Sequence, residues 1–230
     1  MRLLSTNRAG SFALFGDSPS SRYSGVFFWL GGRMFRTISF IDLKENFSSQ
    51  SYDGFCGVRK RGKLEESFCF ANDKNVFFYG LSSPSKFDIV LDCKENYDNR
   101  EWGRFYDIRE EDGLVIVKFS KQDDAHELPG VKFDLFLVFA GVDSFVKIDE
   151  WEVEKYPDDE SRSSPPFERW VYRLGSMTSG SIAVSCSHDR DEAIKLAKSS
   201  LKKKSELLLK ARTIGRLLKH ILTLAILELA

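Results

Sequence analysis

The chain has 230 residues, enough for one large domain or two small ones. Apolar residues make up 42% of it, which suffices for a packed core and excludes wholesale disorder. The 34 basic and 34 acidic residues cancel, and this argues against a polyanion binder, because nucleic-acid affinity rests largely on clustered Lys and Arg. We therefore expect no nucleic-acid partner.

The N-terminus is not expected to be a targeting segment. Its opening, MRLLSTNRAGS, lacks the long apolar core of a secretory signal peptide. The most apolar run of the chain, residues 221–227, is far shorter than the roughly 20 residues that a membrane-spanning helix needs. We expect a cytoplasmic protein with no membrane partner.

Up to about residue 187, short apolar runs alternate with turn residues such as Gly31-Gly32, Asn72-Asp73 and Asp112-Gly113. The runs expected to form strands are 26–30, 35–43, 67–71, 76–79, 87–92, 114–119, 131–140, 145–153, 169–174 and 181–185. Many short strands without long helices between them predict an antiparallel β-sandwich or barrel, and not a βαβ sheet.

Residues 156–167, YPDDESRSSPPF, interrupt this pattern with a polar stretch that contains three prolines. Such a composition predicts an exposed loop between strands. The acidic group Asp158-Asp159-Glu160 lies in this stretch, and we interpret it as a solvated turn and not as catalytic acids, because charge clusters in such loops seldom do chemistry.

From about residue 189 the sequence becomes helical. Asp189, with Glu192 three positions later, is a capping-box pattern, and apolar residues then recur at helical spacing. Gly215 is a candidate interruption of this helix. The apolar end, residues 217–230, calls for a partner surface from this chain, from another copy or from a downstream segment.

The chemistry-bearing residue types are sparse. The four cysteines, at 56, 69, 93 and 186, form no CxxC pair and have no histidine at ligand spacing, so we expect buried reduced thiols and no metal site. No phosphate-binding glycine loop, GxSxG or HExxH pattern occurs, so we expect no cofactor. The 34 acidic residues cannot be sorted into a catalytic pair from sequence, and none is assigned as catalytic.

Residues 97–120, YDNREWGRFYDIREEDGLVIVKFS, mix aromatic and arginine side chains unusually densely. Trp and Tyr faces can stack on sugar rings while Arg and Asp hydrogen-bond hydroxyl groups. The alternative is an ordinary structural ladder in which Arg100 and Arg104 stack on Trp102 and Tyr106. Composition alone leaves both interpretations open.

Three segments resemble the N-terminal part of glycogen-debranching amylo-α-1,6-glucosidases of the archaeal and bacterial type. LLSTNRAGSFALFGDSPSSRYSGVFFW is similar to the opening of that family, with the pair Arg22-Tyr23 followed by Gly25. LDCKENYDNREWGRFYDIREEDGLVIVKFS is similar to a later segment that carries a Trp-Gly-Arg-x-Tyr run. WVYRLGSMTSGSIAVSCSHDRDEAIKLAKSS is similar to a closing strand pair that leads into a helix.

The resemblance implies a β-supersandwich, residues 1–187, followed by a helical linker, residues 188–230, that leads to an (α/α)6 catalytic domain in the same or a separate chain. That catalytic domain would hold both catalytic carboxylates, and it is missing here, so no acid or base is carried over. The residues implied to contact substrate or the domain interface are Arg22, Tyr23, Trp102, Arg104 and Tyr106.

The expected function is therefore that of a non-catalytic N-terminal domain that positions the helical domain of an α-1,6-glucosidase and contacts α-glucan. Three alternatives stay open at this point. The chain could be a stand-alone glucan-binding module, a subunit that docks a separately encoded catalytic chain, or a small complete enzyme. By itself we expect it to be inactive.

Overall fold

The structure, a computed structural model, describes residues 2–53, 56–122 and 132–228, with side chains in the last helix described to Arg216. In this part of the chain, 13 strands form one antiparallel sheet. The strands are β1 Leu3–Thr6, β2 Phe12–Phe15, β3 Gly25–Leu30, β4 Arg33–Asp42, β5 Phe47–Asp53, β6 Cys56–Arg61, β7 Leu64–Phe70, β8 Val76–Glu95, β9 Arg104–Glu111, β10 Leu114–Gln122, β11 Lys132–Ala140, β12 Ser144–Lys155 and β13 Glu168–Ser187. The predicted mainly β, antiparallel fold with a C-terminal helical segment is confirmed.

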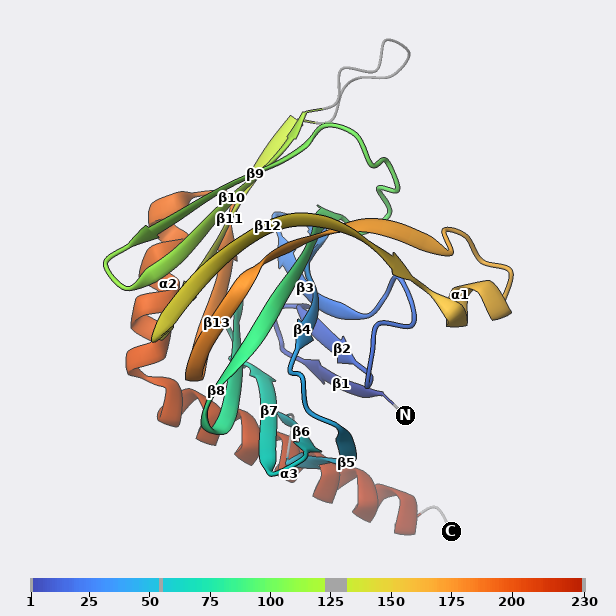
Figure 1. The fold of residues 1–230 in the computed structure, drawn as a ribbon. Coiled ribbons are helices and arrows are strands. Elements are labelled where there is room, and N and C mark those ends of the chain that lie inside the picture. The colour runs from blue at the N-terminus through green and yellow to red at the C-terminus, as the bar shows by residue number, and fades with distance from the viewer. Residues whose placement is uncertain (1, 54–55, 123–131, 229–230) are drawn as a thin grey trace.

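The sheet follows the order β1-β2-β3-β4-β8-β13-β11-β10-β9, with β12 attached to β13 and β5-β6-β7 attached to β8. It curls so that its inner face encloses one apolar core, while helices lie against the outside (Figure 1). Phenylalanines from distant parts of the chain meet in this core, including Phe28, Phe77, Phe119 and Phe139. Burial of these large side chains explains why the chain needs so many of them.

Strands β8 and β13 are each 20 residues long and pair with one another along most of their length. The prediction of two separate strands within each, 76–79 with 87–92 and 169–174 with 181–185, was wrong. The polar middle segments pair with each other, Thr178 opposite Lys86 and Ser179 opposite Ser85. Because this ladder is made by backbone groups, it continues where the apolar pattern stops.

Several short or polar strands escaped prediction, namely β1, β2, β5, β6 and β9. β5, for example, reads FSSQSYD and lies at an edge of the sheet with little burial, so it shows no apolar alternation. The expected turns are present. Asp112 and Gly113 both have positive φ angles, as a two-residue hairpin loop of type I′ requires, and Gly31 and Gly32 do the same between β3 and β4.

Three helices accompany the sheet: α1 Pro157–Ser161, α2 Arg190–Lys202 and α3 Lys204–Glu228. The predicted cap is confirmed, because the Asp189 side chain accepts a hydrogen bond from the Glu192 backbone at 2.7 Å. Ala193 and Ala197 pack α2 onto the outer face of the sheet. Gly215 does not interrupt α3; the break lies at Lys203, where α2 ends.

The stretch 156–167 is not simply an exposed loop, because it contains α1. Asp159 is buried and accepts hydrogen bonds from the Ser21 hydroxyl at 3.0 Å and the Arg22 backbone at 2.7 Å. The interpretation of this acidic group as a solvated turn was therefore wrong for Asp159. Its partners lie about 140 residues away in sequence, where no local pattern can show them.

The prediction of four reduced thiols was also wrong. Cys56 on β6 and Cys69 on β7 form a disulfide, while Cys93 and Cys186 are free and buried. The register of β6 and β7 pairs Gly57 with Phe68, which places the two cysteines opposite one another with Cα atoms 4.5 Å apart. A spacing of 13 residues does not show this register. Among the described residues, no helix is long and apolar enough to cross a membrane.

Gly25 gives a test of the close approach of β3 and β4. Its φ angle is +112°, and a Cβ atom there would overlap the carbonyl oxygen of Ile38. We expect Gly25→Ala to lower the free energy of unfolding by about 3 kcal/mol or more, because left-handed strain and a backbone clash add. Gly31→Ala is the matched control: its φ is +54° but the space is open, so a loss of about 1 kcal/mol is expected. If urea unfolding showed the same loss of unfolding free energy for Gly25→Ala and Gly31→Ala, the clash with Ile38 would be contradicted.

Candidate functional site

A buried carboxylate, Asp92 on β8, is the centre of the most densely charged part of the interior. Its Oδ2 lies 2.7 Å from Nη1 of Arg36 on β4, and its Oδ1 lies 2.8 Å from Nε of Arg169 on β13. Nη1 of Arg104, at the start of β9, is 3.3 Å from Oδ1. All four side chains are at least 97% buried, so these ion pairs are screened little by water.

The end of β12 completes this cluster, which we call the Asp92 cluster. Arg36 donates to the Tyr156 hydroxyl at 2.7 Å and to Glu154 at 3.2 Å, and Ser39 donates to Glu154 at 2.6 Å. The cluster therefore joins β4, β8, β9 and β13 to the segment that leads into α1. Buried charges require such partners, because an unpaired one costs several kcal/mol.

Burial and charge act against each other on the pKa values of the cluster. Burial alone would raise the pKa of Asp92, but the guanidinium groups of Arg169 and Arg36 hold it far below its usual range. Burial raises the pKa of Glu154, and Arg36 offsets only part of that effect. Asp92 is thus locked as a carboxylate and cannot serve as a proton donor near neutral pH.

Lys94 lies on the same side of β8 as Asp92 and is nearly fully buried. Burial lowers the pKa of Lys94 from 10.5 to about 7; the charge of Asp92 opposes this change, and those of Arg169 and Arg36 add to it. Its Nζ lies 3.4 Å from Oδ1 of Asn99, in the segment that follows β8. The cluster and that segment are therefore in direct contact.

Residues 96–103, between β8 and β9, wrap around the amine of Lys121. Lys121 donates to the backbone carbonyls of Trp102 at 2.6 Å and Arg100 at 3.3 Å, and lies 3.8 Å from Asp98. Gly103 has a φ of +65°, which lets the chain turn back into β9. Backbone hydrogen bonds to a buried cation hold this segment in one conformation.

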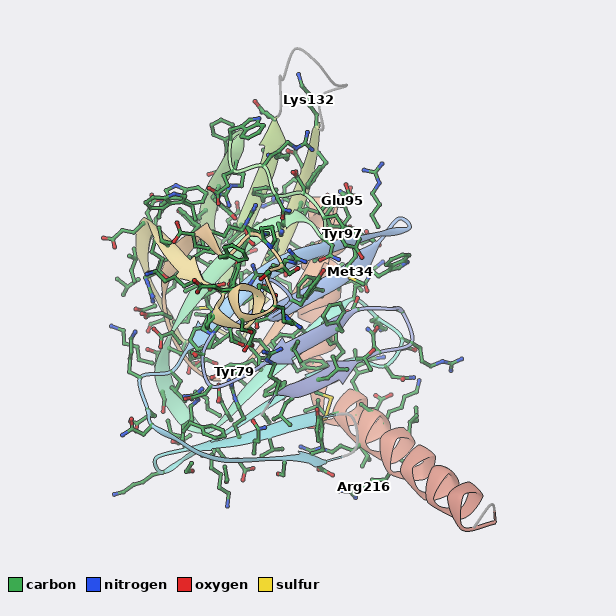
Figure 2. All side chains as sticks on the ribbon, turned by 90° about the vertical axis from the view of Figure 1, so that its right-hand side faces the viewer. Met34, Tyr79, Glu95, Tyr97, Lys132 and Arg216 are labelled. Carbon is green, nitrogen blue, oxygen red and sulfur yellow. A yellow bond between two sulfur atoms is a disulfide. The ribbon has the colours of Figure 1, made fainter. Side chains whose placement is uncertain are left out.

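The segment forms a shallow basin of about 550 Å³, lined by Glu95, Tyr97, Asp98, Asn99, Arg100 and Trp102. Tyr97 is 82% exposed and Trp102 is 57% exposed, so both side chains reach solvent, while the Lys121 amine lies 5.8 Å from the centroid of the Trp102 ring. Figure 2 shows Glu95 and Tyr97 beside Met34 of the β3–β4 hairpin, and the Asn96 backbone donates to the Met34 carbonyl at 2.8 Å. Asp98 accepts from the Arg100 side chain at 2.8 Å, so the polar groups between the rings are fixed.

The predicted site residues fall into three places. Trp102 lines the basin, and Arg104 lies beneath it in the Asp92 cluster. Tyr106 stacks on Tyr172 with centroids 4.3 Å apart, and both Tyr106 and Arg104 contact the ring of Trp151. Arg104 and Tyr106 thus have packing roles, as the structural-ladder interpretation expects, but their ring partners are Trp151 and Tyr172, and it is Lys121 whose amine lies 5.8 Å from the centroid of the Trp102 ring.

Arg22 and Tyr23 lie apart from the basin, next to α1. Arg22 donates to the Ser164 hydroxyl at 2.9 Å and to the Pro165 carbonyl, and its guanidinium lies 5.1 Å from the centroid of the Tyr23 ring. These contacts fix the 156–167 stretch on the sheet. Arg22 and Tyr23 therefore support the far end of the Asp92 cluster, through Tyr156 and α1.

Sequence reasoning missed Arg36, Glu154 and Arg169, which have no motif in common. The available signal was a single charge among mostly apolar neighbours: Arg36 in MFRTISF and Asp92 in IVLDC. A charge in such a position needs a partner. The pairing of these charges depends on the order of the strands in the sheet, and the amino-acid sequence does not show that order.

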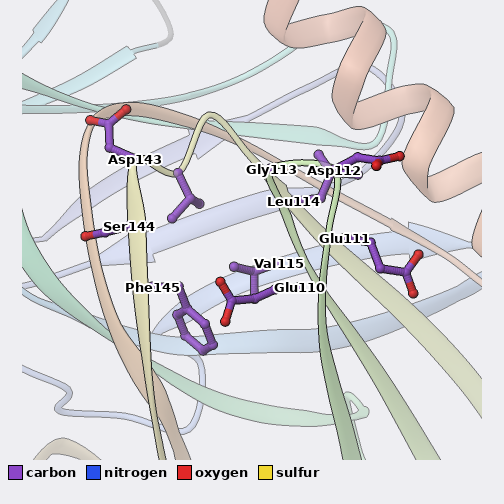
Figure 3. Close-up of a pocket in the computed structure, with 10 residues that line it drawn as sticks. Glu110, Glu111, Asp112, Gly113, Leu114, Val115, Asp143, Ser144 and Phe145 are labelled. Atoms are coloured by element: carbon purple, nitrogen blue, oxygen red, sulfur yellow. The ribbon is translucent and has the colours of Figure 1, made fainter.

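A second recess lies between the β9–β10 turn and the β11–β12 turn and has a volume of about 220 Å³ (Figure 3). Glu110 and Phe145 reach into it from opposite sides, and Asp112 and Asp143 lie at its rim. Its acidic rim has no buried polar group directed at a ligand. In the described part of the chain, no group of three His, Cys, Asp or Glu side chains is placed to hold a metal ion.

No protein-family model matches this chain, and no curated protein matches it.

Asp92 gives a test of the cluster. We expect Asp92→Asn to lower the free energy of unfolding by about 3–5 kcal/mol, because three buried guanidinium groups lose their shared counter-charge. Asp107→Asn is the control: it removes an exposed ion pair to Arg109, at 3.0 Å, and should cost less than about 1 kcal/mol. Denaturant unfolding of both variants measures the difference, and a small loss for Asp92→Asn would rule out the cluster as described.

Lys94 predicts a pH dependence of stability. Its pKa is about 7 in the folded chain and near 10.5 when unfolded, so only the unfolded chain holds the proton between these values. Stability from this group is then fully present above about pH 10.5 and is lost as the pH falls to 7. Relative to Lys94→Met, the natural chain should gain up to about 1.4 kcal/mol per pH unit in that window. Urea unfolding at pH 7.5, 8.5 and 9.5 measures this; a constant difference would refute it.

Proposed function

We propose that this chain is a non-catalytic β domain of a glycogen-debranching-type α-1,6-glucosidase, which contacts α-glucan through the Tyr97–Trp102 basin and positions a helical catalytic domain. The basin is the observation that carries the proposal. Two exposed aromatic rings lie among fixed polar groups, Asp98, Asn99 and Arg100, on a segment held by Lys121. A glucose ring has an apolar C–H face that stacks on an aromatic ring and hydroxyl edges that need such hydrogen-bond partners.

The rigidity of the segment supports this assignment. Binding loses less affinity when the protein groups are already ordered, because side chains and backbone then lose little conformational freedom. Glu101 adds to this order by accepting a hydrogen bond from the Trp170 backbone at 2.9 Å. The shallow shape suits a chain of sugars that continues beyond the basin on both sides.

The order of elements supports the scaffold part of the proposal. The strands end at β13, and α2 and α3 follow directly, as they would in a β domain that leads into a helical one. On β12 and β13, the exposed side chains of Trp151, Val153 and Trp170 share one sheet face, since Val153 is opposite Trp170. Exposed apolar groups of this kind are typical of an interface, here with the proposed (α/α)6 domain.

The proposal assigns no catalytic residue to this chain. Asp92 is a permanently ionised, fully paired carboxylate, and a glycosidase needs one acid and one base on either side of the scissile bond. We therefore expect no glucose release from branched dextrin by the chain alone. The proposal also places the protein in the cytoplasm, as the sequence analysis expects.

Two other functions share the basin. A stand-alone glucan-binding module would bind glycogen and need no further chain, whereas a subunit of a split enzyme would form a defined complex with a separate catalytic chain. The exposed Trp151–Val153–Trp170 face favours the second of these over the first. Sedimentation of the chain with and without the catalytic partner distinguishes them.

The basin makes a direct prediction. We expect Trp102→Ala to weaken binding to soluble glycogen about 5- to 30-fold, because loss of a stacking face costs about 1–2 kcal/mol. Phe105→Ala is the matched control, since Phe105 is also 57% exposed and lies three residues away but does not line the basin. Affinity electrophoresis in glycogen gels measures both. Equal retardation of the two variants and the natural chain would reject the glucan-binding part of the proposal.

A further inference from the structure

The Cys56–Cys69 disulfide lies under the long helix α3. Both cysteines are almost fully buried, and their apolar neighbours are Ala211 and Leu208 of α3. The space left between α3 and these strands amounts to about 10 Å³, which is room for one water molecule at most. The helix therefore rests directly on the disulfide.

The rest of the contact between α3 and the sheet is sparse. Leu207 packs on Val76 and Phe78 of β8, near the start of the helix. Farther along, Lys210 pairs with Asp73 between β7 and β8 at 3.6 Å, and Arg212 and Arg216 both pair with Asp53 at the end of β5. These ion pairs are substantially exposed, and such pairs contribute little to stability. The position of this half of α3 on the sheet thus depends mainly on its packing against β6, β7 and the disulfide that joins them.

We propose that the Cys56–Cys69 bond is a redox-sensitive latch for α3. With the bond formed, Ala211 of α3 packs against the cysteines of β6 and β7. With the bond reduced, α3 detaches from these strands from about residue 208 onward. The reductant is a small or protein dithiol: its two thiols are oxidised to a disulfide, the Cys56–Cys69 bond breaks, and two cysteine thiols form. This inference does not depend on the proposed glucan-binding function.

The physical cause is a change of volume in a filled space. A disulfide holds its sulfur atoms at about 2.05 Å, and two thiols must lie well beyond that distance. The sulfur atoms lie on the face of β6 and β7 that α3 covers, and the space between them and the helix holds one water molecule at most. When the two sulfur atoms separate, they therefore press against Ala211 and Leu208.

The same geometry makes the coupling reciprocal. While α3 is seated it covers the disulfide, so a reductant reaches the sulfur atoms only when the helix lifts. Anything that lifts α3 exposes the buried sulfur atoms and so speeds their reduction. At equilibrium, lifting the helix must also favour the reduced form, just as reduction favours the lifted helix. Both directions can be measured.

The first experiment compares amide hydrogen exchange of the full chain before and after reduction with dithiothreitol. We expect exchange in residues 208–216 of α3 to speed up at least tenfold, while residues 190–202 of α2 stay unchanged. The Cys56→Ser/Cys69→Ser chain should behave like the reduced protein without any reductant. Unchanged α3 exchange, equal acceleration in α2, or four free thiols in the unreduced protein would each overturn the latch.

The second experiment tests the reverse direction. Asp53→Asn removes the ion pairs of Arg212 and Arg216, and we expect dithiothreitol to reduce the disulfide at least threefold faster in this variant. Asp112→Asn is the matched control, because it removes the ion pair that Asp112 makes with Lys198 of α2, at 3.7 Å. Thiol trapping with an alkylating reagent gives the rates. An equal rate in both variants and the natural chain would overturn the reciprocal coupling.

Discussion

The shared counter-charge at Asp92 is the constraint on which most of this structure depends. One carboxylate forms ion pairs with arginines from three other strands, and each arginine is too deeply buried to be hydrated instead. The sheet must therefore bring β4, β8, β9 and β13 to one point in one register. Apolar packing alone tolerates small shifts between strands, but a buried ion cluster does not, because a displaced partner leaves an uncompensated charge.

The basin follows from the same constraint. Arg104 contacts Asp92 and also donates to the carbonyls of Glu101 and of Trp170 on β13, so the cluster anchors the end of the 96–103 segment that leads into β9. Hydrogen bonds from Lys121 and the turn at Gly103 then fix the backbone of residues 96–103. The side chains of Tyr97 and Trp102 remain exposed on this segment. A rigid interior thus produces a rigid exposed surface, and the proposed binding of a flexible α-glucan would require such a surface.

The sequence predicted what is encoded locally. The Asp189 cap, the Asp112-Gly113 turn and most apolar strands depend on neighbouring residues, and they lie where the pattern indicated. The errors concern long-range partners. The Cys56–Cys69 pair, the burial of Asp159 and the continuous β8 all follow from strand register, to which the spacing of residues within a segment gives no access.

The candidate site divides along the same line. Trp102 could be singled out because a tryptophan among arginines is conspicuous in composition, and it does line the basin. Arg104 and Tyr106 were conspicuous for the same reason but point inward, since successive side chains of a strand alternate between faces. Composition identified the segment, and only the fold separated its exposed face from its buried one.

The pairing of β8 with β13 also governs how the chain can acquire its structure. β7 and β4 attach to different parts of β8, and β12 and β11 attach to different parts of β13, so these four strands are organised by one pair whose members are about 90 residues apart. During synthesis, the phenylalanine-rich strands emerge long before β13 exists. Such non-local topology makes folding slow, and the early strands remain open to aggregation until the last strand is complete.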